Sequence, residues 1–247
     1  MIIDIQFSAA VEAWPSLREG VMNAEEAGFD TAWVFDHFAG NVLGGGTTMI
    51  ECFTLLGALA ASPSRIGLGS LVVNVANRNP AVLAKIITAL DVVSNGRAQL
   101  GIGAGWFELE HDAFGIDFGT FTDRFEKLEE ALQIILPMLR GERPSLDGKH
   151  YSIKDAINEP PPVSRIPVMI GGSGEKKTLR MVAQYADESN LTSPSDQLPR
   201  KLEALAAHCE RLGRNRSEIA VSQHLNVVIA STLDDAYKAV VEFLRSR

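Results

Sequence analysis

The chain has 247 residues, of which 46% are hydrophobic and 22% charged, and its formal net charge is −8. This composition is typical of a globular protein with a large core, and the acidic balance excludes the basic surface that nucleic-acid binding requires. No run of about 20 apolar residues is long enough to cross a membrane, no apolar leader follows a basic N-terminus, and Cys52 and Cys209 form no CxxC pair. We therefore expect a cytoplasmic protein in a reducing compartment, with no nucleic-acid or membrane partner.

The first half of the chain alternates strand and helix patterns. Apolar runs of strand length predict strands over residues 2–7, 31–35, 65–73 and 97–103. Between the first two, Ser16 and Glu19 have the spacing of a capping box and Gly28 follows the helical pattern, so a helix is expected there. A glycine-rich loop over 44–46 and a helix over 51–61 come next, and Pro80 opens the helix before the fourth strand.

The second half continues this alternation after one irregular segment. A long helix around Phe125 precedes residues 142–164, where Asp147-Gly148 predicts a hairpin turn, and we expect an insertion here and not a new domain. Further strands are expected over 166–170, 186–191 and 219–229, each followed by a helix. The second of these helices is expected to end at Gly213, and the third is expected to start after Thr232.

The repeated strand-then-helix unit predicts the fold class. Such repeats with short loops specify a parallel sheet with right-handed crossovers. At this length the prediction is one TIM (β/α)8-type barrel domain over residues 1–247, with the hairpin near 142–164 as an insertion. Seven units are visible, so the eighth strand is expected to be missing from this chain.

Residues 165–179 give the strongest signal for a binding site. The apolar run 166–170 ends in Gly171, Gly172, Ser173 and Gly174, and a helix is expected to begin near residues 173–175. A strand, a glycine turn and a helix N-terminus direct free N–H groups and the positive end of the helix dipole to one point, which suits a phosphate group. A plain tight turn is the alternative interpretation.

The chemistry of such a barrel lies at the carboxyl ends of its strands. This rule gathers the segments 36–37, 70–74, 103–106, 171–174 and 190–192 into one pocket. His37 follows an acid at a strand end and is the candidate proton acceptor, with a structural hydrogen-bonding role as the alternative. The bulky residues Val72 and Val73, before Asn74, also fit barrel core.

The glycines of segment 101–105 do not have the spacing of a dinucleotide-binding fingerprint, because Trp106 stands where the third glycine would open a helix. We expect its glycines, Gly105 among them, to let a flat ligand lie close to the backbone, with Trp106 either as a pocket wall or as a core residue.

Residues 108–112 contain four candidate metal ligands, Glu108, Glu110, His111 and Asp112. Their spacing matches no established metal site, so we expect solvated side chains and no metal. A serine-hydrolase site is also excluded, because residues 171–175 lack the second glycine of the nucleophile elbow.

These segments together resemble the bacterial luciferase-like monooxygenase superfamily, and within it the oxidoreductases that use the deazaflavin coenzyme F420. The segments that carry the resemblance are 33–37, 65–69, 78–85, 90–97, 100–106, and 170–175 through 185–187. They follow the family's order over nearly the whole chain, and residues 124–130 and 148–151 fit the deazaflavin branch better than the luciferase branch.

The resemblance implies a barrel that holds the flavin-like ring at its mouth. It places a backbone bulge, often with a non-proline cis peptide, within residues 70–73, and it gives His37 the role of catalytic proton acceptor. The cofactor-binding residues expected are Ser70, Val72, Val73, Asn74, Gly105, Trp106, Gly171, Gly172, Ser173, Gly174 and Thr192.

Two departures from the sugar-phosphate dehydrogenases of this group bear on the substrate. Trp106 stands where those enzymes carry a glutamate, and Ser195 is the nearest match to their substrate-phosphate lysine. Glucose 6-phosphate is therefore a poor guess, and an apolar small molecule is a better one. The leading hypothesis is hydride transfer between F420 and a small organic substrate in a homodimer. The alternatives are a two-component FMN-dependent monooxygenase and a flavin- or deazaflavin-binding protein without turnover.

Overall fold

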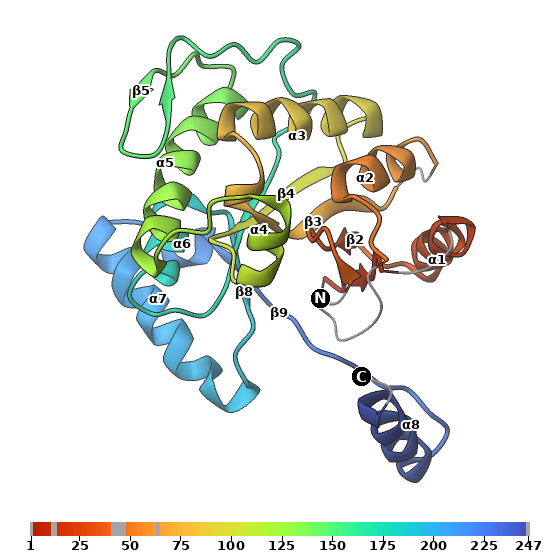
Figure 1. Ribbon diagram of the computed structural model, residues 1–247. Helices are drawn as coiled ribbons and strands as arrows, with labels where there is room; N and C mark the ends of the chain where they lie inside the picture. Colours follow the sequence, from red (N-terminus) through yellow and green to blue (C-terminus); the bar gives the residue numbers. More distant parts are fainter. Residues whose placement is uncertain (1, 11–13, 41–47, 63–64, 246–247) are drawn as a thin grey trace.

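The structure is a computed structural model that describes residues 2–10, 14–40, 48–62 and 65–245. Its core is a curled sheet of seven parallel strands with helices on the outer face (Figure 1). The strands are β1 Ile5–Phe7, β2 Thr31–Val34, β3 Gly67–Asn74, β4 Ala98–Gly103, β7 Val168–Gly171, β8 Glu188–Leu191 and β9 Ala220–Gln223. The helices are α1 Trp14–Ala27, α2 Cys52–Ala60, α3 Pro80–Ser94, α4 Glu108–Phe114, α5 Phe121–Leu139, α6 Thr178–Tyr185, α7 Leu198–Leu212 and α8 Leu233–Arg245.

The seven strands are paired in chain order, β1-β2-β3-β4-β7-β8-β9. All six pairings are parallel, which confirms the predicted βα repeat. Within the described residues β1 and β9 each have one partner, so the sheet is a barrel wall that lacks one strand. The loop predicted over 44–46 lies outside the described residues.

The hairpin insertion is confirmed. Strands β5 (Leu146–Asp147) and β6 (Ser152–Ile153) pair antiparallel between α5 and β7. The turn lies slightly later than predicted, because Asp147 belongs to the first strand and Gly148 donates its N–H to the carbonyl of Tyr151.

Helix ends follow the local chemistry in most places. The Asn79 side chain accepts hydrogen bonds from the N–H groups of Ala81 and Val82, Pro80 occupies the first turn of α3, and Asn95 ends the helix in the left-handed region. Gly28, with φ of +90°, ends α1 as predicted. The capping box predicted at Ser16 is wrong, because α1 already begins at Trp14.

The core is formed where the outer helices pack on the sheet. β2 is buried along its whole length, and Leu17, Val21 and Ala24 of α1 are buried against the same part of the core. The larger cluster joins the inner faces of α3, α5, α6 and α7 to β4 and β7. This packing fixes the sheet, and therefore fixes where the carboxyl ends of the strands meet.

The C-terminal part departs most from the prediction. The strand expected over 219–229 ends at Gln223, and residues 224–232 continue without a strand partner. Helix α8 follows and lies apart from the other helices in Figure 1 (dark blue). No helix in the described part of the chain has both the length and the apolar character of a bilayer span.

Candidate functional site

A cavity of about 530 Å³ lies at the carboxyl ends of the strands. That volume is within the usual range for small-molecule and cofactor sites. The predicted site residues that line it are His37, Val72, Val73, Asn74, Gly105, Trp106, Gly171, Gly172 and Thr192. Ser70, Ser173 and Gly174 are not among the lining residues, and Ser70 is completely buried. Direct cofactor contacts of these three residues stay predictions.

The carboxyl end of β3 contains the irregularity that was expected. The peptide bond between Leu71 and Val72 is cis, and the β3–β4 register shifts between Ser70 and Val73. The bulge turns the Val72 side chain toward the next two strands. A Cβ at Gly103 would lie 2.9 Å from its Cγ2, and a Cβ at Gly171 would lie 2.8 Å from its Cγ1.

This packing adds a role for the glycines in β4 and for Gly105, which follows it. That they let a flat ligand approach the backbone stays a prediction, and their absent side chains also leave space on the side of β3. A Cβ at Gly101 would lie 2.3 Å from the Ser70 carbonyl oxygen, and one at Gly105 would lie 2.4 Å from Asn74 Oδ1. The glycines therefore make room for the bulge, and the bulge in turn shapes the cavity floor.

Trp106 is an exposed wall residue and not a core residue. Its side chain is 65% exposed and lines the cavity. Its ring lies edge-on to the imidazole of His37, with centroids 5.9 Å apart, and contacts the ring of Phe107. The proton-accepting candidate is therefore surrounded by aromatic surface.

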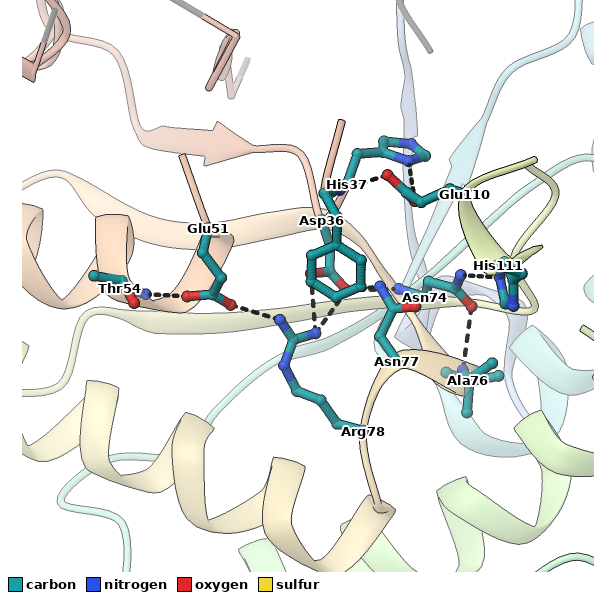
Figure 2. A network of polar contacts seen from close by, with 12 residues as sticks. Asp36, His37, Glu51, Thr54, Asn74, Ala76, Asn77, Arg78, Glu110 and His111 are labelled. Atoms are coloured by element: carbon teal, nitrogen blue, oxygen red, sulfur yellow. Dashed lines mark hydrogen bonds and ion pairs between the residues drawn. The ribbon is translucent and has the colours of Figure 1, made fainter. Parts of the chain in front are cut away.

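His37 is held by a buried carboxylate from another segment. Its Nδ1 lies 3.0 Å from Oε2 of Glu110, whose side chain is 1% exposed (Figure 2). The other carboxylate oxygen of Glu110 accepts the backbone N–H groups of Phe38 and Ala39. Glu110 thus fixes both the imidazole and the backbone that follows it.

Asp36 is also buried, and it organises the ends of β2 and β3. It accepts hydrogen bonds from Arg78 Nη1, the backbone N–H of Asn74 and the Asn77 amide. Burial raises the pKa of Asp36, and the ion pair with Arg78 opposes that shift. Arg78 also reaches Glu51, the N-cap of α2, so this network joins three elements (Figure 2).

Asn74 is fixed on its other side by His111. The Asn74 amide nitrogen lies 2.8 Å from His111 Nε2, while its oxygen accepts the N–H of Ala76 (Figure 2). Burial lowers the pKa of His111, which favours the neutral ring that can accept this bond at Nε2. Its Nδ1 has no hydrogen-bond partner among the described residues.

The expectation of solvated side chains in residues 108–112 is wrong for two of them. Glu110 and His111 are buried, because α4 turns them inward against the ends of β2 and β3. The available signal was their spacing from Phe107, since positions i, i+3 and i+4 share one helix face. Glu110 and His111 bind different partners and form no common metal site.

The one close group of three potential metal ligands in the described chain lies elsewhere. It consists of Asp123, Glu126 and His150. The Lys149 ammonium already lies 3.1 Å from Asp123 Oδ1 and 2.8 Å from Glu126 Oε2. This arrangement is an ion-pair cluster that supplies its own cation.

The glycine turn after β7 opens onto the same cavity as His37. Gly172 donates its N–H to the Asn190 carbonyl, and Ser173 Oγ accepts the N–H of Thr192. The N–H groups of Ser173 and Gly174 donate to no group in the described chain. Helix α6 begins at Thr178, later than predicted, and its N-cap Lys177 makes no side-chain capping bond.

Two cations accompany this turn: Lys177, whose place three residues after Gly174 already put its charge near the turn, and Arg124, which sequence reasoning did not select. Arg124, from the first turns of α5, lines the cavity, and its guanidinium lies 3.9 Å from the Phe118 ring centroid. Lys177 Nζ lies 5.1 Å from the Phe121 ring centroid. Neither cation has a carboxylate partner within the described residues, which leaves both free to pair with an anionic ligand group.

The chain belongs to the luciferase-like monooxygenase family, whose model matches residues 4–247. It is 32% identical over 208 residues to an F420-dependent glucose-6-phosphate dehydrogenase of Microbacterium testaceum (strain StLB037), a match that covers 83% of this chain and 61% of that protein. It is 30% identical over 239 residues to the pyrimidine monooxygenase RutA of Pseudomonas syringae pv. syringae (strain B728a), covering 92% of this chain and 64% of that protein. The chain therefore spans slightly more than three fifths of the length of these relatives.

Solved structures confirm the fold. The F420-dependent tetrahydromethanopterin reductase of Methanopyrus kandleri superimposes with a TM-score of 0.83 at 23% identity, over 98% of this chain and 72% of the other. A riboflavin lyase superimposes with a TM-score of 0.85 at 17% identity, over 99% of this chain and 66% of the other. The curled parallel sheet is thus the barrel of this family.

Proposed function

We propose that this chain is an oxidoreductase domain that binds the deazaflavin coenzyme F420 and exchanges a hydride with a small organic substrate. The observation that carries the proposal is the composition of one cavity. It joins an anchored imidazole, His37, to apolar walls and to an unpaired cation, Arg124, beside the glycine turn. Family membership and relatives named for F420 support the same conclusion.

The residues present fit a flavin-like cofactor with a phosphate-bearing side chain. Val72 and Trp106 offer apolar surface for a flat ring. Arg124 lines the cavity, and the turn that follows the cavity-lining Gly172 carries the undonated N–H groups of Ser173 and Gly174 and then Lys177, so we infer positive potential on this side. We assign the ring to the first pair and the phosphate to the second set.

His37 has the geometry for handling the proton in this reaction. When bound, the deazaflavin supplies a ring carbon that accepts or donates a hydride. His37 would take the hydroxyl proton of an alcohol substrate as the hydride leaves carbon, and Trp106 would keep water from that side. These roles require the substrate to lie between His37 and the ring.

The proposed substrate is apolar and lacks a phosphate. Trp106 occupies the wall nearest to His37, and Ser195 is outside the cavity, where its hydroxyl pairs with Gln223. The cavity therefore offers a secondary alcohol or ketone an aromatic surface at the reacting end. A sugar phosphate would find no cation for its phosphate at the positions of Trp106 and Ser195.

An FMN-dependent monooxygenase is the second candidate. The observation in its favour is the similarity to pyrimidine monooxygenase RutA over 92% of this chain. The ring surface and the phosphate end described above would also serve FMN.

A comparative coenzyme titration tests the proposal. Purified protein is titrated with F420 and with FMN, and quenching of each fluorophore gives a dissociation constant. We expect F420 to bind at least tenfold more tightly than FMN; the reverse order would favour the monooxygenase, and binding of neither would contradict both. In the F420-loaded protein, His37→Ala should lower turnover of a secondary alcohol by about 100-fold or more while the cofactor dissociation constant stays within about twofold.

We further propose a cytoplasmic homodimer. The buried, unpaired thiols of Cys52 and Cys209 support a reducing compartment. Sedimentation velocity on the purified protein tests the dimer.

A further inference from the structure

We propose that Glu110 is a positioning residue that fixes the tautomer of His37, with the proton on Nδ1 and the lone pair of Nε2 directed to the substrate. The inference rests on the proposed role of His37 for its catalytic consequence, but the tautomer itself is a property of the free protein. Its basis is the set of donors that surround one buried carboxylate.

The contacts of Glu110 determine the direction of its hydrogen bond with His37. Two backbone N–H groups, from Phe38 and Ala39, converge on Oε1, and a backbone N–H can only donate. The remaining oxygen, Oε2, faces His37 Nδ1 at 3.0 Å. A carboxylate has acceptors only, so Nδ1 must carry the hydrogen, and a neutral imidazole then has its acceptor at Nε2.

The other side of the imidazole is free to meet a ligand. Nε2 of His37 hydrogen-bonds to no group in the described residues, and His37 lines the cavity. The ring is held by aromatic neighbours, with Trp106 edge-on at 5.9 Å and Phe107 edge-on at 6.2 Å between centroids. Packing therefore orients the ring, and Glu110 selects which nitrogen is the acceptor. Catalytic histidines need both the orientation and the tautomer to be fixed.

Substituting Glu110 with glutamine inverts this selection. The backbone donors of Phe38 and Ala39 require the amide oxygen, so the amide NH2 must take the place of Oε2 and donate to Nδ1. Nδ1 then becomes the acceptor and Nε2 carries the hydrogen. E110Q is almost the same size as the native side chain and should therefore present the wrong tautomer to the substrate.

The test reads the tautomer directly. Long-range ¹H–¹⁵N correlation spectra of the cofactor-free protein, at a pH where the ring is neutral, distinguish protonated Nδ1 from protonated Nε2. We expect Nδ1–H in the wild type, Nε2–H in E110Q, and Nδ1–H in the control E108Q, which makes the same charge change on the exposed face of the same helix. Nε2–H in the wild type, or no change of tautomer in E110Q, would overturn the inference, whatever happens to thermal stability.

Kinetics of the F420-loaded enzyme separate this inference from the proposed function. E110Q should lower kcat for alcohol oxidation about 100-fold, with cofactor affinity unchanged within about twofold, and E110D should restore part of the loss. A switched tautomer with unchanged kcat would leave the positioning intact and refute the catalytic role of His37. A reduced kcat with an unswitched tautomer would refute the positioning.

Discussion

Arg124 is the cavity-lining cation that we propose to pair with the phosphate of the cofactor. Its Nη1 donates to the Gly119 carbonyl and its guanidinium lies over the Phe118 ring, but its Nε has no hydrogen-bond partner in the described chain. A cation beside an apolar cavity is costly to leave unpaired, because burial removes its hydration. A bound phosphate next to the glycine turn would meet that need.

Arg124→Gln should therefore weaken binding of phosphate-bearing cofactors selectively. We expect the dissociation constant for FMN to rise about 10- to 100-fold, the range for losing a charged hydrogen bond, and that for riboflavin to change less than about twofold. Fluorescence titration measures both. Arg140→Gln, at the exposed far end of α5, is the control with the same charge change. An equal loss for FMN and riboflavin would instead indicate that Arg124 only supports the loop around Phe118.

At the scale of elements, the junction of β3, β4 and β7 sets the cavity floor. The β3 bulge seats Val72 against the missing side chains of Gly103 and Gly171. A side chain at either glycine would overlap a methyl group of Val72, and a β-branched side chain has few alternative rotamers. The Val72 side chain of β3 therefore fits only if β4 and β7 carry glycine at the positions that it contacts.

This matching predicts strong coupling between Gly171 and Val72. G171A should lower the free energy of unfolding by about 1–3 kcal/mol, the usual range for overpacking. In a V72A background the same change should cost less than about 0.5 kcal/mol, because the nearest remaining atom is Cβ at 3.6 Å. Urea denaturation of the four proteins measures the coupling. G57A, where nothing lies within 4 Å, should not destabilise the protein; an equal cost of G171A in both backgrounds would refute the proposed contact.

The order and type of most elements could be predicted from the sequence, since buried strands and amphipathic helices leave local patterns. His37 could be selected from its position after an acid at a strand end, and the bulge could be placed through the family resemblance. Glu110 could not be assigned, because its partner His37 is 73 residues away and its significance arises only when α4 packs on the strand ends. Arg124 was missed for the same reason: one arginine in a charged helix start has no local signature.

At the scale of the whole molecule, packing is uneven along the chain. Two hydrophobic clusters, both in contact with Phe53, fill the interior from α1 to α7, whereas residues 224–235 are exposed throughout. Leu233 and Tyr237, four residues apart on α8, are 72% and 63% exposed. A helix of this length gains little from its own hydrogen bonds, because most helical stability in proteins comes from packing.

Amide hydrogen exchange should follow this division. We expect the amides of α8 to exchange orders of magnitude faster than those of α3, whose inner face is buried against the sheet. Mass spectrometry of peptides from 80–94 and 233–245 compares the two helices in one sample. Comparable protection would mean that α8 packs on a surface, and repeating the measurement over a range of protein concentrations would then distinguish packing within one chain from packing between chains.

Helix α4 holds two cavity-lining side chains through two neighbouring residues, His37 through Glu110 and Asn74 through His111. A small tilt of this seven-residue segment would shift both walls together. We therefore expect substitutions of Leu109 and Phe114, which α4 exposes to solvent, to change the shape of a pocket that neither of them lines. Laboratory evolution aimed at new substrates would do well to include these outward-facing positions in its libraries.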